Sequence, residues 1–322
     1  MSKVFFKDDA VIPDMRYDEV FKAVFTRENP QARKALSGLV SACIRRNVKV
    51  LALNANEPAP TSAYDKRIRY DIVCCLESGE LADVEITLNP KPDEPFREEF
   101  FAAKLFVAQD LSGSDKEYSK LKKIYQINIL AEGKRWKDDE LLHCFRFYDE
   151  EHGLSFKGQM HIIVVELSKA VKLAREKPVS QMSGVESWAV FLRYHPEKKR
   201  RSLVNEILKE KEDIAMAGES ALSFSKEQLE YFHNMSKLKY ELDEQSERAW
   251  RKRKLQEAKE RALKKGLKEG RATGRAEGRA EGIAKGINEG IRKTARKMKS
   301  WGDPIKKIAD ITGLSPTEIK KL

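Results

Sequence analysis

The 322-residue sequence lacks three features that would assign it to a well-defined class. No apolar run approaches the ~20 residues that a membrane-spanning helix needs, and none follows the opening MSKVFFKDDA, so we expect a soluble, cytoplasmic protein. The four cysteines show no CxxC or other metal-ligand spacing, and the adjacent pair Cys74 and Cys75 within an apolar run predicts reduced core residues rather than zinc ligands. The five histidines form neither a zinc-hydrolase motif nor a Cys/His nucleophile pair.

Positive charge is concentrated at the C-terminal end. Residues 251–322 hold 22 of the 62 Lys and Arg residues but only 9 of the 51 Asp and Glu residues, so the preceding part has a net charge of −2 although the whole chain has +11. Such a field suits nucleic-acid phosphates, whose counterions are released when cationic side chains bind. A solvated, charged helix explains the same composition, so charge alone leaves the partner open.

Hydrophobic periodicity predicts an α/β domain over residues 1–200. Apolar residues recur at helical spacing over residues 17–25, 32–44, 97–110 and 186–194. Strand-like apolar runs occupy residues 48–53, 69–76, 81–88, 124–130, 142–148 and 161–167, and the proline-containing residues 54–62 are expected to form a loop. The order α-α-β-β-β-α-β-β-β predicts helices layered on a central sheet.

A charged helical segment, residues 201–298, follows, and seven glycines recur at every fourth position from Gly266 to Gly290. Each glycine inside a helix costs ~1 kcal/mol relative to alanine. The repeat is therefore either a flexible spacer or a surface for helix–helix self-association, with Ile283, Ile287 and Ile291 packing beside the glycines. Because a four-residue step drifts ~40° per repeat, such a contact would be short or winding.

The last segment, residues 299–322, has the pattern of a helix-turn-helix pair. A turn at Thr312 and Gly313 separates two short apolar patterns, and the second helix is expected to begin with Ser315 as N-cap, Pro316 at the first position and Glu318 at the third. A pair of this kind serves as a packing or dimer cap as readily as it reads DNA.

A hairpin in the sequence YDIVCCLESGELADVEITL contains the most informative residues. A three-residue loop of Glu77, Ser78 and Gly79, with Gly79 in the left-handed conformation, places Asp71 opposite Glu85. Alternation then separates two faces. One face is apolar, with Ile72, Cys74, Leu76, Ala82, Val84, Ile86 and Leu88; the other presents Arg69, Asp71, Val73, Cys75, Leu81, Asp83, Glu85 and Thr87.

Opposed carboxylates repel each other unless a cation or a shared proton compensates. A hard divalent ion, Mg²⁺ or Mn²⁺, suits two carboxylates and retains water ligands for chemistry, so Asp71 and Glu85 are candidate metal ligands. The alternative is that both acids are solvated on an exposed face and balanced by Arg69 or a nearby lysine.

The sequence resembles the Rpn recombination-promoting nucleases, also described as PD-(D/E)XK nuclease family transposases. The resemblance is carried, in order, by YDEVFKAVF, RYDIV, VEITL, the Phe-rich helix from Arg97 to Gln109, Tyr118, and the strand at 124–130. The four-residue glycine repeat and the ending TGLSPTEIKKL also look like family features, so the resemblance covers nearly the whole chain.

The resemblance implies a restriction-endonuclease-like core, a central mixed sheet flanked by helices, that acts on DNA with a divalent metal in a bacterial cell. It makes Asp71 and Glu85 metal ligands and Asp18 an accessory acid, and it places Gln109 and Tyr118 along the site.

One position departs from the family pattern. Thr87 stands where the wider superfamily has Lys and this family typically has Gln. A hydroxyl orients a water but brings no positive charge to lower its pKa or to stabilise the transition state. Lys22 is a candidate substitute cation, although an i,i+4 ion pair with Asp18 is a simpler role for it.

Three functions follow from these features. The first is a Mg²⁺-dependent DNA endonuclease, joined as a homodimer or higher oligomer through the C-terminal helix, in recombination, mobile elements or phage defence. The second is a catalytically impaired nuclease fold that binds DNA or a protein partner, which Thr87 favours. The third is an assembly protein whose main element is the glycine-repeat helix.

Overall fold

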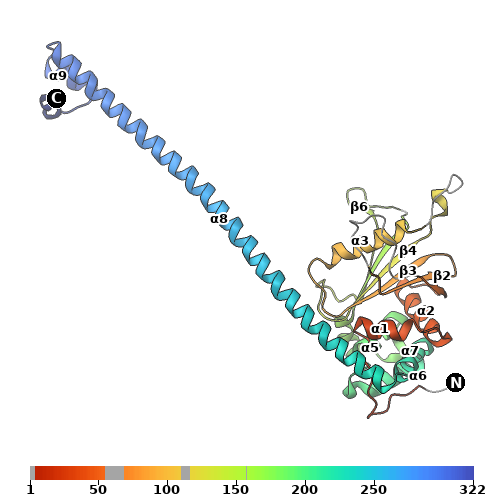
Figure 1. Cartoon of the computed structure of the whole chain (residues 1–322). Helices are drawn as coiled ribbons and strands as arrows, with labels where there is room; N and C mark the ends of the chain where they lie inside the picture. Colours follow the sequence, from red (N-terminus) through yellow and green to blue (C-terminus); the bar gives the residue numbers. More distant parts are fainter. Residues whose placement is uncertain (1–3, 55–68, 110–116, 157) are drawn as a thin grey trace, which may run out of the picture. The chain divides into compact units, whose positions relative to one another are not determined.

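A computed structural model describes residues 4–54, 69–109, 117–156 and 158–322 of the chain (Figure 1). It divides into two compact units, Met1–Lys239 and Tyr240–Leu322. The elements of the first unit are, in chain order, α1 (Asp18–Phe25), α2 (Pro30–Ile44), β1 (Val50–Leu53), β2 (Ile72–Leu76), β3 (Leu81–Thr87), α3 (Glu94–Val107), β4 (Ile124–Leu130), β5 (Leu142–Phe145), β6 (Tyr148–Asp149), β7 (Leu154–Ser155), β8 (Met160–Glu166), α4 (Ala170–Glu176), α5 (Gly184–Tyr194), α6 (Arg201–Glu210) and α7 (Glu212–Leu222).

The central sheet is mixed, with the strand order β1-β2-β3-β4-β8-β5. β1, β2 and β3 are antiparallel neighbours, β3, β4 and β8 are parallel, and β5 closes one edge antiparallel to β8. Helix α3 makes the crossover from β3 to β4. The predicted mixed sheet flanked by helices is thereby confirmed.

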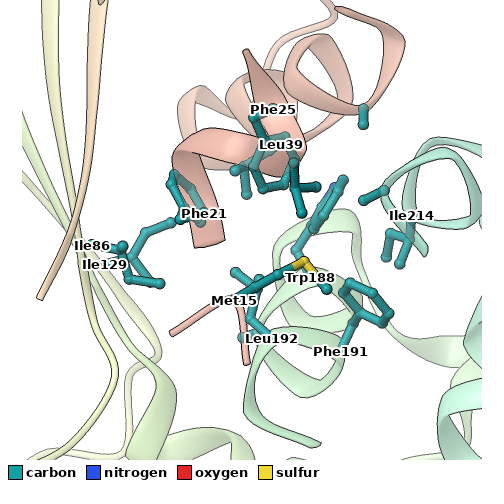
Figure 2. Packing of buried hydrophobic residues seen from close by; sticks show 14 of the residues in the cluster. Met15, Phe21, Phe25, Leu39, Ile86, Ile129, Trp188, Phe191, Leu192 and Ile214 are labelled. Atoms are coloured by element: carbon teal, nitrogen blue, oxygen red, sulfur yellow. The ribbon is translucent and has the colours of Figure 1, made fainter. Parts of the chain in front are cut away.

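Two hydrophobic clusters cover the two faces of the sheet. The larger contains residues of α1, α2, α5, α6 and α7 with the apolar face of the hairpin, and the smaller packs Phe101, Ala102 and Leu105 of α3 on the other face. In the larger cluster Phe21 of α1 points at Ile86 and Ile129 of the sheet (Figure 2). This contact seats α1 beside the end of β3.

Local sequence chemistry sets the limits of α2. The Asn29 side chain accepts a hydrogen bond from the Ala32 amide at 2.7 Å, and Pro30 occupies the first turn, where its missing amide proton costs nothing. Arg45 ends the helix in the left-handed conformation at φ 55°.

The structure differs from the sequence-based prediction in two places. The first unit extends beyond residue 200, because α7 packs closely against α2, and α6 packs on α5 and α7. The strand predicted at 142–148 is split between β5 of the main sheet and β6, which pairs with β7. Two other predictions, most of the loop at 54–62 and the end of the helix at residue 110, lie outside the described residues.

The C-terminal elements are α8 (Lys226–Ser300), α9 (Ile305–Thr312) and α10 (Pro316–Lys321), of which α8 begins within the first unit. Phe232 near the start of α8 belongs to the main core. Gly313 adopts φ 68°, and Ser315 and Glu318 form a reciprocal capping box at the start of α10, as the sequence predicts. Ala295, Met298, Ile308 and Ile319 form a separate small core that joins α9 and α10 to the end of α8.

A candidate phosphodiesterase site at the end of the hairpin

The hairpin has the register that the sequence predicts. Paired residues run from Cys75 with Leu81 to Ile72 with Val84, and Gly79 takes φ 78° in the turn. Asp71 lies one residue beyond the last pair, next to Glu85.

Beyond the last pair, hydrogen bonds from backbone amides to side-chain carboxyl groups replace the backbone hydrogen bonds between β2 and β3. The Asp71 amide donates to Glu85 Oε1 at 2.7 Å, and the Ile86 amide donates to Asp71 Oδ2 at 3.2 Å. The two carboxyl groups are therefore held next to each other at the end of β2, and both are buried, with 9% exposure for Asp71 and 4% for Glu85. The alternative of two acids solvated on an exposed face is wrong.

Asp71 and Glu85 each form an ion pair, and the two cations come from different helices. Lys22 Nζ of α1 lies 2.8 Å from Asp71 Oδ1, and the Arg97 guanidinium of α3 lies 2.9 Å from Glu85 Oε2. Lys22 lies farther from Asp18, at 3.9 Å, so its closer partner is the hairpin acid and not the acid on its own helix. Burial would lower the pKa of Lys22, but Asp71 and Asp18 raise it further, so the ammonium stays charged.

A third acid, Asp83, lies two residues before Glu85 on the same face of β3 and is fully buried. Gln126 Nε2 of β4 donates to Asp83 Oδ2 at 2.6 Å and also contacts Asn128 Oδ1 at 3.3 Å. Asp83 Oδ1 and Gln126 Oε1 are buried without a hydrogen-bond partner in the described part of the chain.

Acidic side chains are crowded at this end of the hairpin. Lys22 lies next to Asp71 and Asp18, and Arg97 is shared between Glu85 and Glu94, from which it lies 2.6 Å. Burial, with the charge of Asp71, raises the pKa of Glu85 to about 7 even though Arg97 and Lys22 oppose the shift. Burial and the charge of Glu85 raise the pKa of Asp83 well above its usual value. Burial and the neighbouring carboxylates therefore both oppose the ionisation of Glu85 and Asp83.

The donor set fits a divalent cation. Within the described residues no three His, Cys, Asp or Glu side chains form a group that could hold a metal ion. Mg²⁺, however, commonly binds through one or two carboxylates and completes its shell with waters and substrate phosphate oxygens. Asp71 and Glu85, whose carboxyl groups lie next to each other, supply two such carboxylates.

The remaining residues expected at the site are dispersed. Thr87 is the last residue of β3, two positions after Glu85, and pairs with Leu130. The side chain of Gln109 exchanges two hydrogen bonds with the backbone of Lys122, whose side chain lies near Gly79 in the turn. This places Gln109 at the opposite end of the hairpin, level with Gly79, six residues from Glu85 or about 20 Å at ~3.3 Å per residue. Tyr118 is 84% exposed, in a 3₁₀ turn (Tyr118–Lys120) of the segment that follows α3.

Sequence reasoning missed Arg97 as an ion-pair partner and Asp83, Gln126 and Asn128 as part of the site. A signal was present in the strand YQINIL, where Gln126 and Asn128 alternate with apolar residues. In a strand buried on both faces, such polar positions identify the row that faces another polar group.

Comparison with protein families decides what kind of fold this is. A model of the PD-(D/E)XK nuclease family transposases matches residues 15–249. The chain belongs to this family. Its members are nucleases, and PD-(D/E)XK nucleases generally use divalent metal ions. No curated protein and no solved structure matches the chain. None of the helices in the described part of the chain is both long and apolar enough to cross a membrane.

Proposed function

We propose that this PD-(D/E)XK protein is a metal-dependent endonuclease that hydrolyses phosphodiester bonds of DNA at Asp71 and Glu85. The observation that supports the proposal is the burial of these two carboxyl groups side by side at the open end of the hairpin, with a lysine against one of them. Burial and neighbouring carboxylates oppose the ionisation of Glu85 and Asp83. A bound divalent cation stabilises buried carboxylates of this kind.

Asp71 and Glu85 would hold the ion, which we take to be Mg²⁺ or Mn²⁺. When bound, a divalent ion polarises the phosphate and lowers the pKa of a bound water. The residues of the chain contribute the rest. Hydrogen bonds from the Asp71 and Ile86 amides hold both carboxylates in place, and Thr87, two residues after Glu85, would orient a water through its hydroxyl group.

Lys22 supplies the positive charge that Thr87 lacks. Its ammonium group lies 2.8 Å from Asp71 and is held by α1, whose Phe21 packs on the sheet (Figure 2). We propose that Lys22 stabilises negative charge developing on the phosphate, with Asp18 as the accessory acid that orients it. Arg97 acts on the other side as the partner that keeps Glu85 turned towards Asp71.

Plasmid cleavage tests the assignment. We expect nicking of supercoiled DNA in Mg²⁺ that a chelator stops and that Asp71→Ala and Glu85→Ala each abolish. Glu99→Gln, which changes an exposed acid on α3, is the matched control and should cleave normally. Nicking that survives both alanine substitutions in purified protein would refute the site.

Lys22 is tested separately. Lys22→Ala should lower the cleavage rate by about 100-fold or more, as expected for loss of one transition-state charge partner, while Lys22→Arg should recover part of the rate. If Lys22 has only a structural role, Lys22→Ala should lower the thermal stability, and the cleavage rate of the folded variant should stay within a few fold of that of the natural protein.

A second function is favoured by one feature, the pairing of both carboxylates with Lys22 and Arg97 in a chain that has Thr87 at the motif position. In that case the fold binds DNA or a protein partner without cutting. DNA affinity that is insensitive to chelator and falls steeply with salt, in protein that cleaves no DNA in Mg²⁺ or Mn²⁺, would establish it.

Self-association through α8 completes the proposal. In the part of the chain that the structure describes, nothing lies within 4 Å of the position that a Cβ would take on any glycine from Gly266 to Gly290. Seven open glycines weaken an isolated helix, whereas close packing of a second copy of α8 would compensate. We infer a homodimer, in keeping with a role in DNA recombination or mobile elements.

A further inference from the structure

A group of aromatic side chains lies at the edge of the sheet, where His143 and Phe145 of β5 are on the same face as Glu85. The ring of Trp136, from the loop before β5, lies tilted against His143 at a centroid distance of 4.5 Å and against Phe145 at 5.2 Å. Phe145 is 43% exposed, although it belongs to a strand of the main sheet. These three rings are called the edge platform below.

The strand register connects the edge platform to the proposed site. Glu85 pairs with Asn128, Asn128 with Val164, and Val164 with His143, so one row crosses the sheet from the site to the platform. Three strand spacings of ~4.8 Å separate the two ends, about 14 Å in all. An extended single strand of DNA would cover that distance with a few nucleotides.

A series of side-chain contacts through α3 connects the proposed site with the edge platform. Arg97 pairs with Glu85, and the next residue of α3, Glu98, holds Arg135 through two hydrogen bonds of 2.7 and 2.8 Å. The Arg135 guanidinium in turn lies over the ring of Trp136, 5.4 Å from its centroid. The edge platform is therefore positioned by the same helix that positions Glu85.

The surroundings of the platform favour a polyanion. Lys134, Arg135 and Lys137 flank Trp136, and Arg146 follows Phe145. Within the described residues no acidic side chain forms an ion pair with Lys134, Lys137 or Arg146.

Two acids of the same loop are paired with other residues. Asp138 contacts Lys169 at 2.7 Å and His143 at 3.3 Å, and Asp139 contacts Lys172 at 2.7 Å. Glu140 is a further exposed acid of this loop, against the three cations Lys134, Lys137 and Arg146, so the charge near Phe145 remains positive on balance.

Exposed aromatic rings beside cationic side chains are the arrangement that stacks nucleobases while the backbone phosphates are neutralised. The bases of a duplex stack on one another and offer no free face. We propose that Trp136, His143 and Phe145 stack unpaired bases of the strand whose phosphate is held at Asp71 and Glu85. Resting on the proposed nuclease function, this makes the substrate DNA with a single-stranded portion.

Binding measurements test the platform independently of cleavage. Full-length protein with Asp71→Asn, which removes cleavage, is titrated into fluorescein-labelled oligo-dT and into a dA·dT duplex of the same length, and anisotropy gives both affinities. Phe145→Ala should weaken single-strand binding roughly tenfold, within the 5- to 150-fold range for loss of one stacked base, and leave duplex binding unchanged. Phe145→Tyr should bind normally, because it retains a ring. Phe5→Ala, which removes a 60% exposed ring in the N-terminal segment, is the control.

A second readout excludes a folding effect. A 2-aminopurine base in the oligonucleotide loses fluorescence when it stacks on a protein ring, and we expect this quenching with Trp136→Phe but not with Phe145→Leu, which keeps an apolar side chain. Equal single-strand affinity with and without the Phe145 ring, or equal loss on duplex and single strand, would overturn the platform. Cleavage can fail while ring-dependent binding persists, and the reverse can also occur, so the two proposals fail separately.

Discussion

The charge cluster predicts that Glu85 destabilises the metal-free protein at neutral and alkaline pH. Its pKa is raised from 4.5 to about 7, because burial and Asp71 disfavour the ionised form. A carboxyl whose folded pKa exceeds its unfolded pKa contributes stability that is present below the unfolded value and lost as pH rises through the folded value. Between about pH 5 and pH 8 the metal-free protein should therefore become less stable.

The magnitude follows from the shift. At 1.36 kcal/mol per pKa unit, ionisation of Glu85 costs about 3 kcal/mol of unfolding free energy, and Asp83 acts in the same direction. Glu85→Gln replaces the protonated form with a neutral isostere and removes this cost. We expect the variant to be about 3 kcal/mol more stable than the natural protein at pH 8, roughly 10 °C in Tm, and nearly equal to it at pH 5.

Urea unfolding and thermal melts in chelator, at pH 5 and pH 8, measure the effect, with Glu99→Gln as the control that should show no pH-dependent difference. Added Mg²⁺ should stabilise the natural protein at pH 8 more than at pH 5, and more than it stabilises Glu85→Gln, because the ion binds only the folded, ionised site. Equal effects of Glu85→Gln at both pH values, or a natural protein whose metal-free stability is flat over this range, would refute the reasoning.

Three further substitutions test other parts of the chain. Gly38→Ala would bring a Cβ to 2.2 Å from the Asp213 carboxylate where α2 meets α7, so chemical denaturation should show a loss of about 1–3 kcal/mol. Gly282→Leu should abolish the proposed self-association in sedimentation velocity, whereas Glu281→Ala on the same helix should retain it; two identical sedimentation profiles would contradict the glycine interface. Ser315→Ala removes the N-cap of α10 and should cost about 1 kcal/mol in the C-terminal core, seen as faster amide exchange there.

The sequence alone predicted those parts of the fold that depend on neighbouring residues. Apolar periodicity identified α1, α2, α3 and α5, and the turn at Gly79 gave the hairpin register that brings Asp71 next to Glu85. Turns and helix caps depend on three or four neighbouring residues, and the side chains of a strand alternate with a period of two. Both features can therefore be predicted from the local sequence alone. The predicted domain ended at residue 200, whereas α7 packs on α2 and α6 packs on α5 and α7, which are contacts between residues far apart in the chain.

Only the tertiary structure decided which charges meet. The spacing of Lys22 and Asp18 on one helix suggested a local ion pair, but the rotation of α1, set by Phe21 packing on the sheet, turns Lys22 towards Asp71. Gln109 lies at the far end of the hairpin for a similar reason, because the length and position of α3 determine where its last turn falls. The alternation of residues specifies the face on which a side chain lies, but how one element sits on another depends on packing between residues far apart in the chain.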